Sequence, residues 1–304
     1  MTQSDGTIAT ADGLQLFYQS VGSGPQTVVV PNGTYLTDDF ARLAANRRFI
    51  FYDVRNRGRS ETVTDAARLE RGVLHDVDDL DAVRAHFGLR DMALLGHSYV
   101  GFTVIRCAMR YPHQITRVVQ ICPMPPDQTK QYPPHLTGAD ATLGEFFAKL
   151  GALQKERASY DEETFCRKFW SLLRYIYVTD PADADKIDKW SRCELPNERN
   201  FMSKWMMYIQ PSIQRLAPSP EDFAKVTMPV LTVHGRKDRS AAYGGGRDWA
   251  LALPDARLVT IENGGHAPWI EAPDVVFDAI ETFLDGAWPS TAERVAELDP
   301  APRR

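Results

Sequence analysis

Residues 92–112 read MALLGHSYVGFTVIRCAMRYP, and this stretch decides the fold. The apolar run at 92–95 predicts a buried strand, and the apolar stretch 102–109, which stops before Pro112, predicts a helix. Between them lies Gly96-His97-Ser98. A strand, a sharp turn and a helix in this order project a serine hydroxyl above the edge of a sheet, beside the N–H groups of the helix N-terminus. The stretch therefore predicts that Ser98 is a nucleophile, and a serine that only caps the helix is the alternative.

The segments on both sides of this turn predict an α/β fold with a parallel sheet. Valine, leucine and phenylalanine recur at three- and four-residue steps over 73–87, and Gly88 follows, which indicates an amphipathic helix with its C-terminal cap. A last amphipathic helix is expected over 273–284. Short apolar or alternating runs predict further strands at 14–19, 27–30, 49–52, 118–122, 230–233 and 257–261. A strand, a helix and a strand at this spacing imply parallel pairing.

The pattern changes after Cys122, where prolines stand at 123, 125 and 126. From there to about residue 225 the chain loses its β-branched runs and becomes helical and rich in aromatic residues. We therefore expect a core made of residues 1–122 and 226–290, interrupted by a helical insert at 123–225. A loosely ordered tail is expected at 291–304.

A serine hydroxyl needs an adjacent base, and the base needs an acid that orients it. The strand at 230–233 is followed by a tight loop that carries Asp238. The strand at 257–261 is followed by Gly264-Gly265-His266, in which the two glycines free the backbone to turn a histidine inward. We expect His266 to be the base and Asp238 the acid; Asp127, just past the strand at 118–122, is the rival acid.

These motifs resemble the α/β-hydrolase superfamily over residues 7–285. Gly-His-Ser-Tyr at 96–99 is similar to the nucleophile turn of its aminopeptidase, esterase and carbon–carbon hydrolase branches, and the order Ser, acid, His agrees. The sequence departs from the family at Val100, where a glycine is usual; here the glycine follows at Gly101. The resemblance implies the α/β-hydrolase fold, a mostly parallel sheet flanked by helices with an inserted helical cap.

The resemblance also implies an oxyanion hole made of two backbone N–H groups. One is that of Tyr99, which follows the nucleophile. The other is that of Thr34, because Pro31-Asn32-Gly33-Thr34-Tyr35 stands in the place of the family's His-Gly motif; an ordinary Asn-Gly turn is the alternative. Residues 52–60 resemble a loop that braces the site in relatives, and we expect a structural role for them.

The function expected is hydrolysis of a carboxylic ester or a small amide through an acyl-enzyme, with a small-molecule substrate and with neither metal nor organic cofactor. An aminopeptidase similar to proline iminopeptidase is the alternative, and a member of the fold that binds a ligand without turnover is the second. Carboxylates of the cap offer an amine-binding set for the aminopeptidase, or else a solvated surface: Glu145, Glu162, Glu194 and Glu198. The sequence does not identify the substrate-binding residues.

Composition narrows the classes of partner. The formal net charge is −5 and no positive patch is clustered, so we expect neither nucleic acid nor an anionic membrane as partner. No secretory signal and no apolar run of about 18 residues is visible, which favours a cytoplasmic protein. The four cysteines (107, 122, 166 and 193) show no CxxC spacing and are expected to be free and structural, with Cys107 as a rival nucleophile. A homo-oligomer is left open.

Overall fold

The computed structural model describes residues 2–130, 132 and 140–297, and its core is an eight-stranded sheet. The strand order is β1-β2-β4-β3-β5-β6-β7-β8. β1 pairs antiparallel with β2 and β2 with β4, whereas every other neighbouring pair is parallel. The strands are β1 (Gln3–Ala9), β2 (Gln15–Val21), β3 (Thr27–Pro31), β4 (Arg48–Tyr52), β5 (Met92–His97), β6 (Ile115–Ile121), β7 (Val230–Gly235) and β8 (Ala256–Ile261). The predicted α/β fold with a mostly parallel sheet is confirmed.

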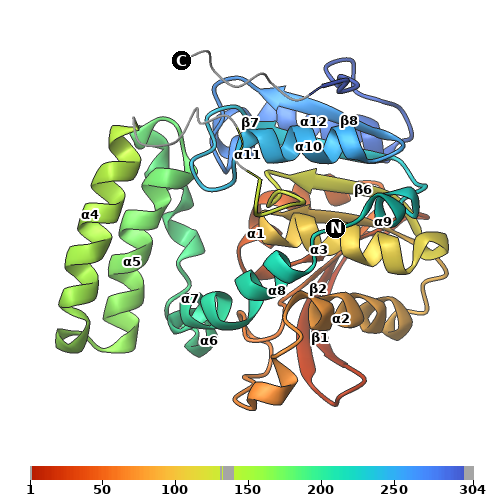
Figure 1. Cartoon of the computed structure of the whole chain (residues 1–304). Coiled ribbons are helices and arrows are strands. Elements are labelled where there is room, and N and C mark those ends of the chain that lie inside the picture. Colours follow the sequence, from red (N-terminus) through yellow and green to blue (C-terminus); the bar gives the residue numbers. More distant parts are fainter. Residues whose placement is uncertain (1, 131, 133–139, 298–304) are drawn as a thin grey trace.

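Helices cover both faces of the sheet (Figure 1). Successive residues of β3 show this: Val28 and Val30 pack in one buried cluster, and Val29 packs in the other. Burial on both faces explains why the parallel strands read as unbroken apolar runs. The first cluster includes side chains of α1 (Gly33–Phe40) and α12 (Pro273–Leu284), and the second those of α2 (Val73–His86), α3 (Tyr99–Arg110) and α10 (Tyr243–Ala252).

Between β6 and β7 the described chain is helical, and we call residues 123–225 the helical insert. Figure 1 shows its two longest helices, α4 and α5, side by side at one edge of the molecule. The elements are α4 (Ala141–Lys155), α5 (Glu162–Tyr177), a 3-10 helix (Pro181–Trp190), α6 (Pro196–Arg199), α7 (Phe201–Lys204), a π-helical turn (Trp205–Ile209), α8 (Gln210–Arg215) and α9 (Pro220–Ala224). Every helix in the described part of the chain is too short or too polar to cross a bilayer.

The expectation of four free thiols is wrong for two of them. Cys166 in α5 and Cys193, which precedes α6, form a disulfide with a Cα–Cα distance of 5.9 Å. No local spacing indicates this bond, because the two cysteines are 27 positions apart and only the fold of the insert brings them together. Cys107 and Cys122 are free and buried. Burial raises the pKa of the Cys107 thiol, which removes the chemical basis for a nucleophile there.

The described part of the tail also differs from the expectation of loose order. Glu293 exchanges two backbone hydrogen bonds of 2.9 Å with Leu258 of β8, and Val295 is 6% exposed. Residues 291–297 therefore lie against the edge of the sheet. Residues 298–304 fall outside the described part.

Candidate active site

Ser98 occupies a strained turn between β5 and α3. Its backbone angles are φ 60° and ψ −129°, a conformation that residues other than glycine rarely adopt. The turn is held on both sides, since the Ser98 N–H donates to the Ile121 carbonyl over 3.0 Å and the Ser98 carbonyl accepts from the Met124 N–H over 3.1 Å. The side chain is half-buried, and the turn has the form that the sequence predicted.

The departure at Val100 is accommodated by the glycine after it. A Cβ on Gly101 would lie 2.8 Å from the Cβ of Pro123, so this glycine takes the close approach to the chain that follows β6. Val100 is 1% exposed, and its side chain packs in the cluster with α2 and α3.

The topology of the sheet brings the expected residues to one edge. β3, β5, β6, β7 and β8 are neighbours and run parallel, so their carboxyl ends share one edge of the sheet. Asn32, Ser98 and Cys122 each follow directly after such a strand end. Asp238 follows β7 within three residues, and His266 follows β8 within five. Ligands of open α/β sheets bind at this kind of edge.

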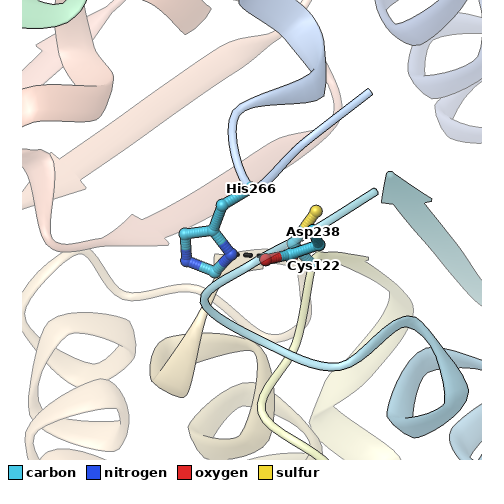
Figure 2. Close-up of side chains that lie close together, drawn as sticks. All are labelled: Cys122, Asp238 and His266. Carbon is cyan, nitrogen blue, oxygen red and sulfur yellow. Dashed lines mark hydrogen bonds and ion pairs between the residues drawn. The ribbon is translucent and has the colours of Figure 1, made fainter. Parts of the chain in front are cut away.

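Asp238 and His266 form a buried pair, which Figure 2 shows with its hydrogen bond. Nδ1 of His266 lies 2.8 Å from Oδ2 of Asp238, and both side chains are fully buried. The other carboxylate oxygen accepts from the N–H groups of Ser240 (2.7 Å) and Ala241 (2.8 Å). Burial raises the pKa of Asp238, but the two nearby histidines, His266 and His234, and their hydrogen bonds outweigh it and hold that pKa far below its usual range. The carboxylate is therefore ionised.

The other ring nitrogen of His266 points away from Asp238 in Figure 2. It is buried and has no hydrogen-bond partner among the described residues. Because Nδ1 donates to a carboxylate, Nε2 is the basic nitrogen of the neutral ring. No hydrogen bond joins Ser98 Oγ to it or to any other described residue in this structure.

Two further histidines support this pair. Nε2 of His97 lies 2.9 Å from the main-chain oxygen of His266, and Nδ1 of His97 lies 2.7 Å from the Tyr35 hydroxyl. A carbonyl only accepts, so Nε2 of His97 carries the proton and Nδ1 accepts from Tyr35. Burial and the neighbouring His266 lower the pKa of His97 well below its usual value, so the ring is neutral. Nε2 of His234, the second of these histidines, lies 3.2 Å from Asp238 Oδ2.

The rival acid Asp127 lies in a local turn. Its Oδ1 accepts from the N–H (2.8 Å) and the hydroxyl (2.6 Å) of Thr129. These bonds lower its pKa, and no contact joins it to His266. The structure thus places Asp238, and not Asp127, beside the histidine.

The residues expected to supply the oxyanion hole begin the helices that follow two neighbouring strands, β5 and β3. Tyr99 is the first residue of α3 and Thr34 the second of α1, so their N–H groups belong to the first turns, which have no partner within the helix. The helix at 33–40 was not predicted; Asn32 is its N-cap, in the left-handed conformation at φ 67°. The Thr34 hydroxyl donates to Asp53 over 2.8 Å, and Asp53 also accepts from the Arg59 N–H over 2.8 Å. The loop 52–60 thus braces Thr34, in agreement with the role expected for it.

A cavity of about 300 Å³ lies between the sheet edge and the helical insert, and Ser98 lines it. Of the described residues that line it, Arg57 alone is charged, and none is a carboxylate. Its other polar residues are Asn32, Gln210 and Ser240, and its apolar and aromatic residues are Tyr35, Tyr99, Met124, Trp170, Leu173, Tyr177, Trp190, Phe201, Met202 and Trp205.

The carboxylates considered as an amine-binding set are engaged elsewhere. Glu198 is completely buried and paired with Arg57. Glu194 pairs with Arg192 over 2.7 Å. Glu145 pairs with Lys149 along α4, and Glu162 accepts from Asn200 over 3.2 Å. The described chain does not assemble this set in the cavity.

Cys122 completes the group drawn in Figure 2. Its sulfur, an Asp238 oxygen and a His266 nitrogen lie within 4.8 Å of one another, a spacing that also suits metal ligands. Burial raises the pKa of this thiol well above its usual value, which disfavours the thiolate that metals prefer. The three side chains are therefore better suited to the hydrogen bonds that they already make than to a metal ion.

Glu271 is a residue of the site that sequence reasoning left without a role. One carboxylate oxygen accepts from the N–H of Gly265 (2.6 Å) and the other from the N–H of Thr179 (2.5 Å). It therefore ties the residue before His266 to the end of α5. A glutamate five residues after His266 is visible in the sequence. Its contact with Thr179 of the insert has no sequence signal, because it depends on the fold.

Known proteins resemble the chain over most of its length. A family model described as alpha/beta hydrolase fold matches residues 31–273. A non-heme haloperoxidase of Rhodococcus erythropolis is 32% identical over 294 residues, which cover 91% of this chain and 98% of that protein. A proline iminopeptidase of Pestalotiopsis fici is 24% identical over 290 residues, 90% of this chain and 97% of that protein. The solved structure of an esterase from Exiguobacterium antarcticum matches with a TM-score of 0.68 at 16% identity, covering 92% of this chain and 99% of that one.

Proposed function

The chain belongs to the alpha/beta hydrolase fold family, and from this premise we propose that it is a serine hydrolase of carboxylic esters. Ser98 is the nucleophile, His266 the general base and Asp238 the acid that orients the base. The observation that carries the proposal is the pair in Figure 2: Nδ1 of His266 is bound to an ionised carboxylate, while its buried Nε2 has no partner in the described chain.

The reaction follows from these groups. Ser98 Oγ attacks the ester carbonyl and passes its proton to Nε2 of His266, and the N–H groups of Thr34 and Tyr99 stabilise the oxyanion. The imidazolium returns the proton to the leaving alkoxide, which departs as an alcohol. Water then attacks the acyl-enzyme with His266 again as base, and Ser98 is released with a carboxylic acid. Ser98 Oγ has to turn towards Nε2 of His266 when substrate binds. In many enzymes the catalytic hydrogen bonds become short only in the complex with substrate.

The cavity favours esters over N-terminal residues of peptides. Its wall of aromatic and aliphatic side chains suits an apolar acyl or alcohol group. An aminopeptidase has to bind a protonated amine, and no described residue that lines the cavity carries a negative charge. Hydrolysis of small amides by the same chemistry is the second activity that the residues allow.

Covalent labelling tests the proposal. A fluorophosphonate should add one phosphonyl group to the wild-type protein, detected by intact mass, and none to Ser98→Ala. Ser240→Ala removes another hydroxyl of the same cavity and should still be labelled. Aryl esters should be hydrolysed faster than aminoacyl arylamides. A label that persists on Ser98→Ala contradicts the proposal; a labelled protein that prefers the arylamides favours the aminopeptidase.

A further inference from the structure

Arg57 is the one charged side chain among the described residues that line the cavity, whose wall is mostly aromatic and aliphatic. Its Nε and Nη2 atoms each lie 2.9 Å from an oxygen of Glu198, in a two-pronged ion pair between the core loop and α6. The Arg57 side chain is 11% exposed and that of Glu198 is fully buried. The Gly58 N–H donates to the same carboxylate over 2.7 Å. The glutamate therefore fixes the direction of the guanidinium.

The remaining nitrogen of Arg57, Nη1, has no partner among the described residues. The arginine stays protonated, because Glu198 raises its pKa further than burial lowers it. Its plane is also held from another side, with the guanidinium carbon 4.7 Å from the centre of the Phe201 ring. The guanidinium is fixed in direction and has a free donor at the cavity, so a bound substrate that covers this donor without offering an acceptor leaves it unpaired, which is costly.

We propose that Arg57 determines substrate specificity, by donating from Nη1 to a neutral acceptor oxygen carried by the apolar body of the ester. The inference rests on the function proposed above. Glu198 already neutralises the guanidinium, so the pair attracts a keto or ether oxygen without demanding a negative charge. Discrimination is expected to be strong, because an analogue without the oxygen leaves the donor unpaired in the complex.

Matched ester pairs test this inference. 4-Nitrophenyl tetrahydropyran-4-carboxylate differs from 4-nitrophenyl cyclohexanecarboxylate by one ether oxygen in the acyl group. Tetrahydropyran-4-yl acetate and cyclohexyl acetate place the same change in the alcohol. In at least one pair the wild type should show a ratio of kcat/KM, oxygenated over hydrocarbon, that is about tenfold or more above the ratio of a variant without Nη1.

The variants are chosen so that the buried carboxylate of Glu198 is never left without a cation beside it. Arg57→Met/Glu198→Gln removes both charges and should lose the preference. Glu198→Gln alone is the matched control, because it keeps Arg57 and an acceptor for the Gly58 N–H, and it should retain the preference. Arg57→Lys keeps a positive charge but lacks Nη1, and it should lose the preference too. It therefore tests the inference even if the double variant fails to fold.

The outcomes separate this inference from the proposed function. A purely structural role of Arg57 lowers the rates of both esters of a pair together and leaves their ratio unchanged in the variants. That result, or a wild type with no greater ratio than Arg57→Lys in either pair, overturns the inference while Ser98 is still labelled by a fluorophosphonate. Loss of labelling in the wild type overturns the proposed function itself.

Discussion

The ring of His97 donates from Nε2 to the main-chain carbonyl of His266 over 2.9 Å. The residue before the nucleophile therefore holds the loop that carries the base. Tyr35 completes the link, because its hydroxyl donates to the other nitrogen of His97 and its ring lines the cavity. The orientation of the base and the wall of the cavity are thus joined through one neutral imidazole.

Replacement of His97 should affect turnover more than substrate binding. His97→Phe breaks both bonds and frees the His266 loop, so we expect kcat to fall by about tenfold or more with a smaller change in KM. Tyr35→Phe breaks only the outer bond and should cost less. Steady-state kinetics on an aryl ester decide this, and an equal or larger loss for Tyr35→Phe would contradict the link described above.

Asp238→Asn should lower kcat by a factor on the order of 10³–10⁴, because an amide does not stabilise the imidazolium and permits the wrong tautomer of His266. Asp127→Asn is the matched control, since that carboxylate accepts only from its own turn and should be dispensable. The measurement is kcat for both variants on one ester. Comparable losses in the two variants would show that the acid has been misassigned.

Asp76 should make stability depend on pH. Its side chain is 1% exposed, and neither carboxylate oxygen has a partner in the described chain. Burial and the nearby Asp79 raise its pKa to about 8, against the opposing effect of Arg55 and Arg57. The folded protein therefore favours the protonated carboxyl group of Asp76. The contribution of this group to the free energy of unfolding is complete below the unfolded pKa of about 4, and it is lost as the pH rises towards 8.

Asp76→Asn removes this titration. The free energy of unfolding of the variant minus that of the wild type should increase from pH 5 to pH 8.5, by on the order of a few kcal/mol. Urea unfolding at both pH values measures the difference. If the two proteins lose or gain stability in parallel across this interval, the carboxyl does not titrate there.

The disulfide should stabilise the helical insert. It closes a loop between Cys166 and Cys193, which are 27 positions apart, and this corresponds to about 3 kcal/mol of unfolding free energy. Cys166→Ser/Cys193→Ser should melt at a lower temperature than the oxidised wild type. Dithiothreitol should lower the melting temperature of the wild type and leave that of the double variant unchanged; a wild type insensitive to the reductant would refute the expectation.

Gly58→Ala should be far more damaging than Gly88→Ala. Both glycines have positive φ angles, +53° and +61°. A Cβ on Gly58 would lie 2.1 Å from an Asp53 oxygen and 2.4 Å from the Thr34 hydroxyl, whereas a Cβ on Gly88 meets open space. Gly88→Ala should lower the free energy of unfolding by about 1–2 kcal/mol, because an alanine there has a left-handed backbone. Gly58→Ala should lower it further and should also reduce esterase activity. Thermal unfolding and kinetics of both variants give the comparison.

Most strands, and the loops that carry the candidate catalytic residues, could be predicted because they are marked by local sequence. The six buried strands β3 to β8 read as apolar runs, and each catalytic candidate follows one of them. β1 escaped prediction because its residues, QSDGTIA, are polar and lie at the open edge of the sheet. α10 escaped because it contains Gly244-Gly245-Gly246, which propensity excludes from helices. A Cβ at Gly246 would lie 2.2 Å from Nδ1 of His234, so close packing selects glycine there.

The part of the site that could not be predicted depends on contacts between distant segments. The ion pair of Arg57 joins residues 141 positions apart, and the bond from Thr179 to Glu271 spans 92. Neither Arg57 nor Glu271 carries a local signal of its role, because an arginine or a glutamate in a loop usually lies in solvent. Sequence motifs locate the candidate catalytic residues, whereas the side chains that surround them are brought together only by tertiary structure.

The position of the helical insert sets a limit on how this protein can diversify. The chain leaves the sheet after β6 and returns in β7, which pairs with β6 from Val118 opposite Val230 to Ile121 opposite Val233. A different excursion of suitable span between these strands could leave the sheet intact, provided that it keeps a partner for Glu271, which in this structure ties Gly265 to Thr179 of the insert. A replacement also has to supply a counterion for Arg57, because Glu198, which pairs with it here, belongs to the insert.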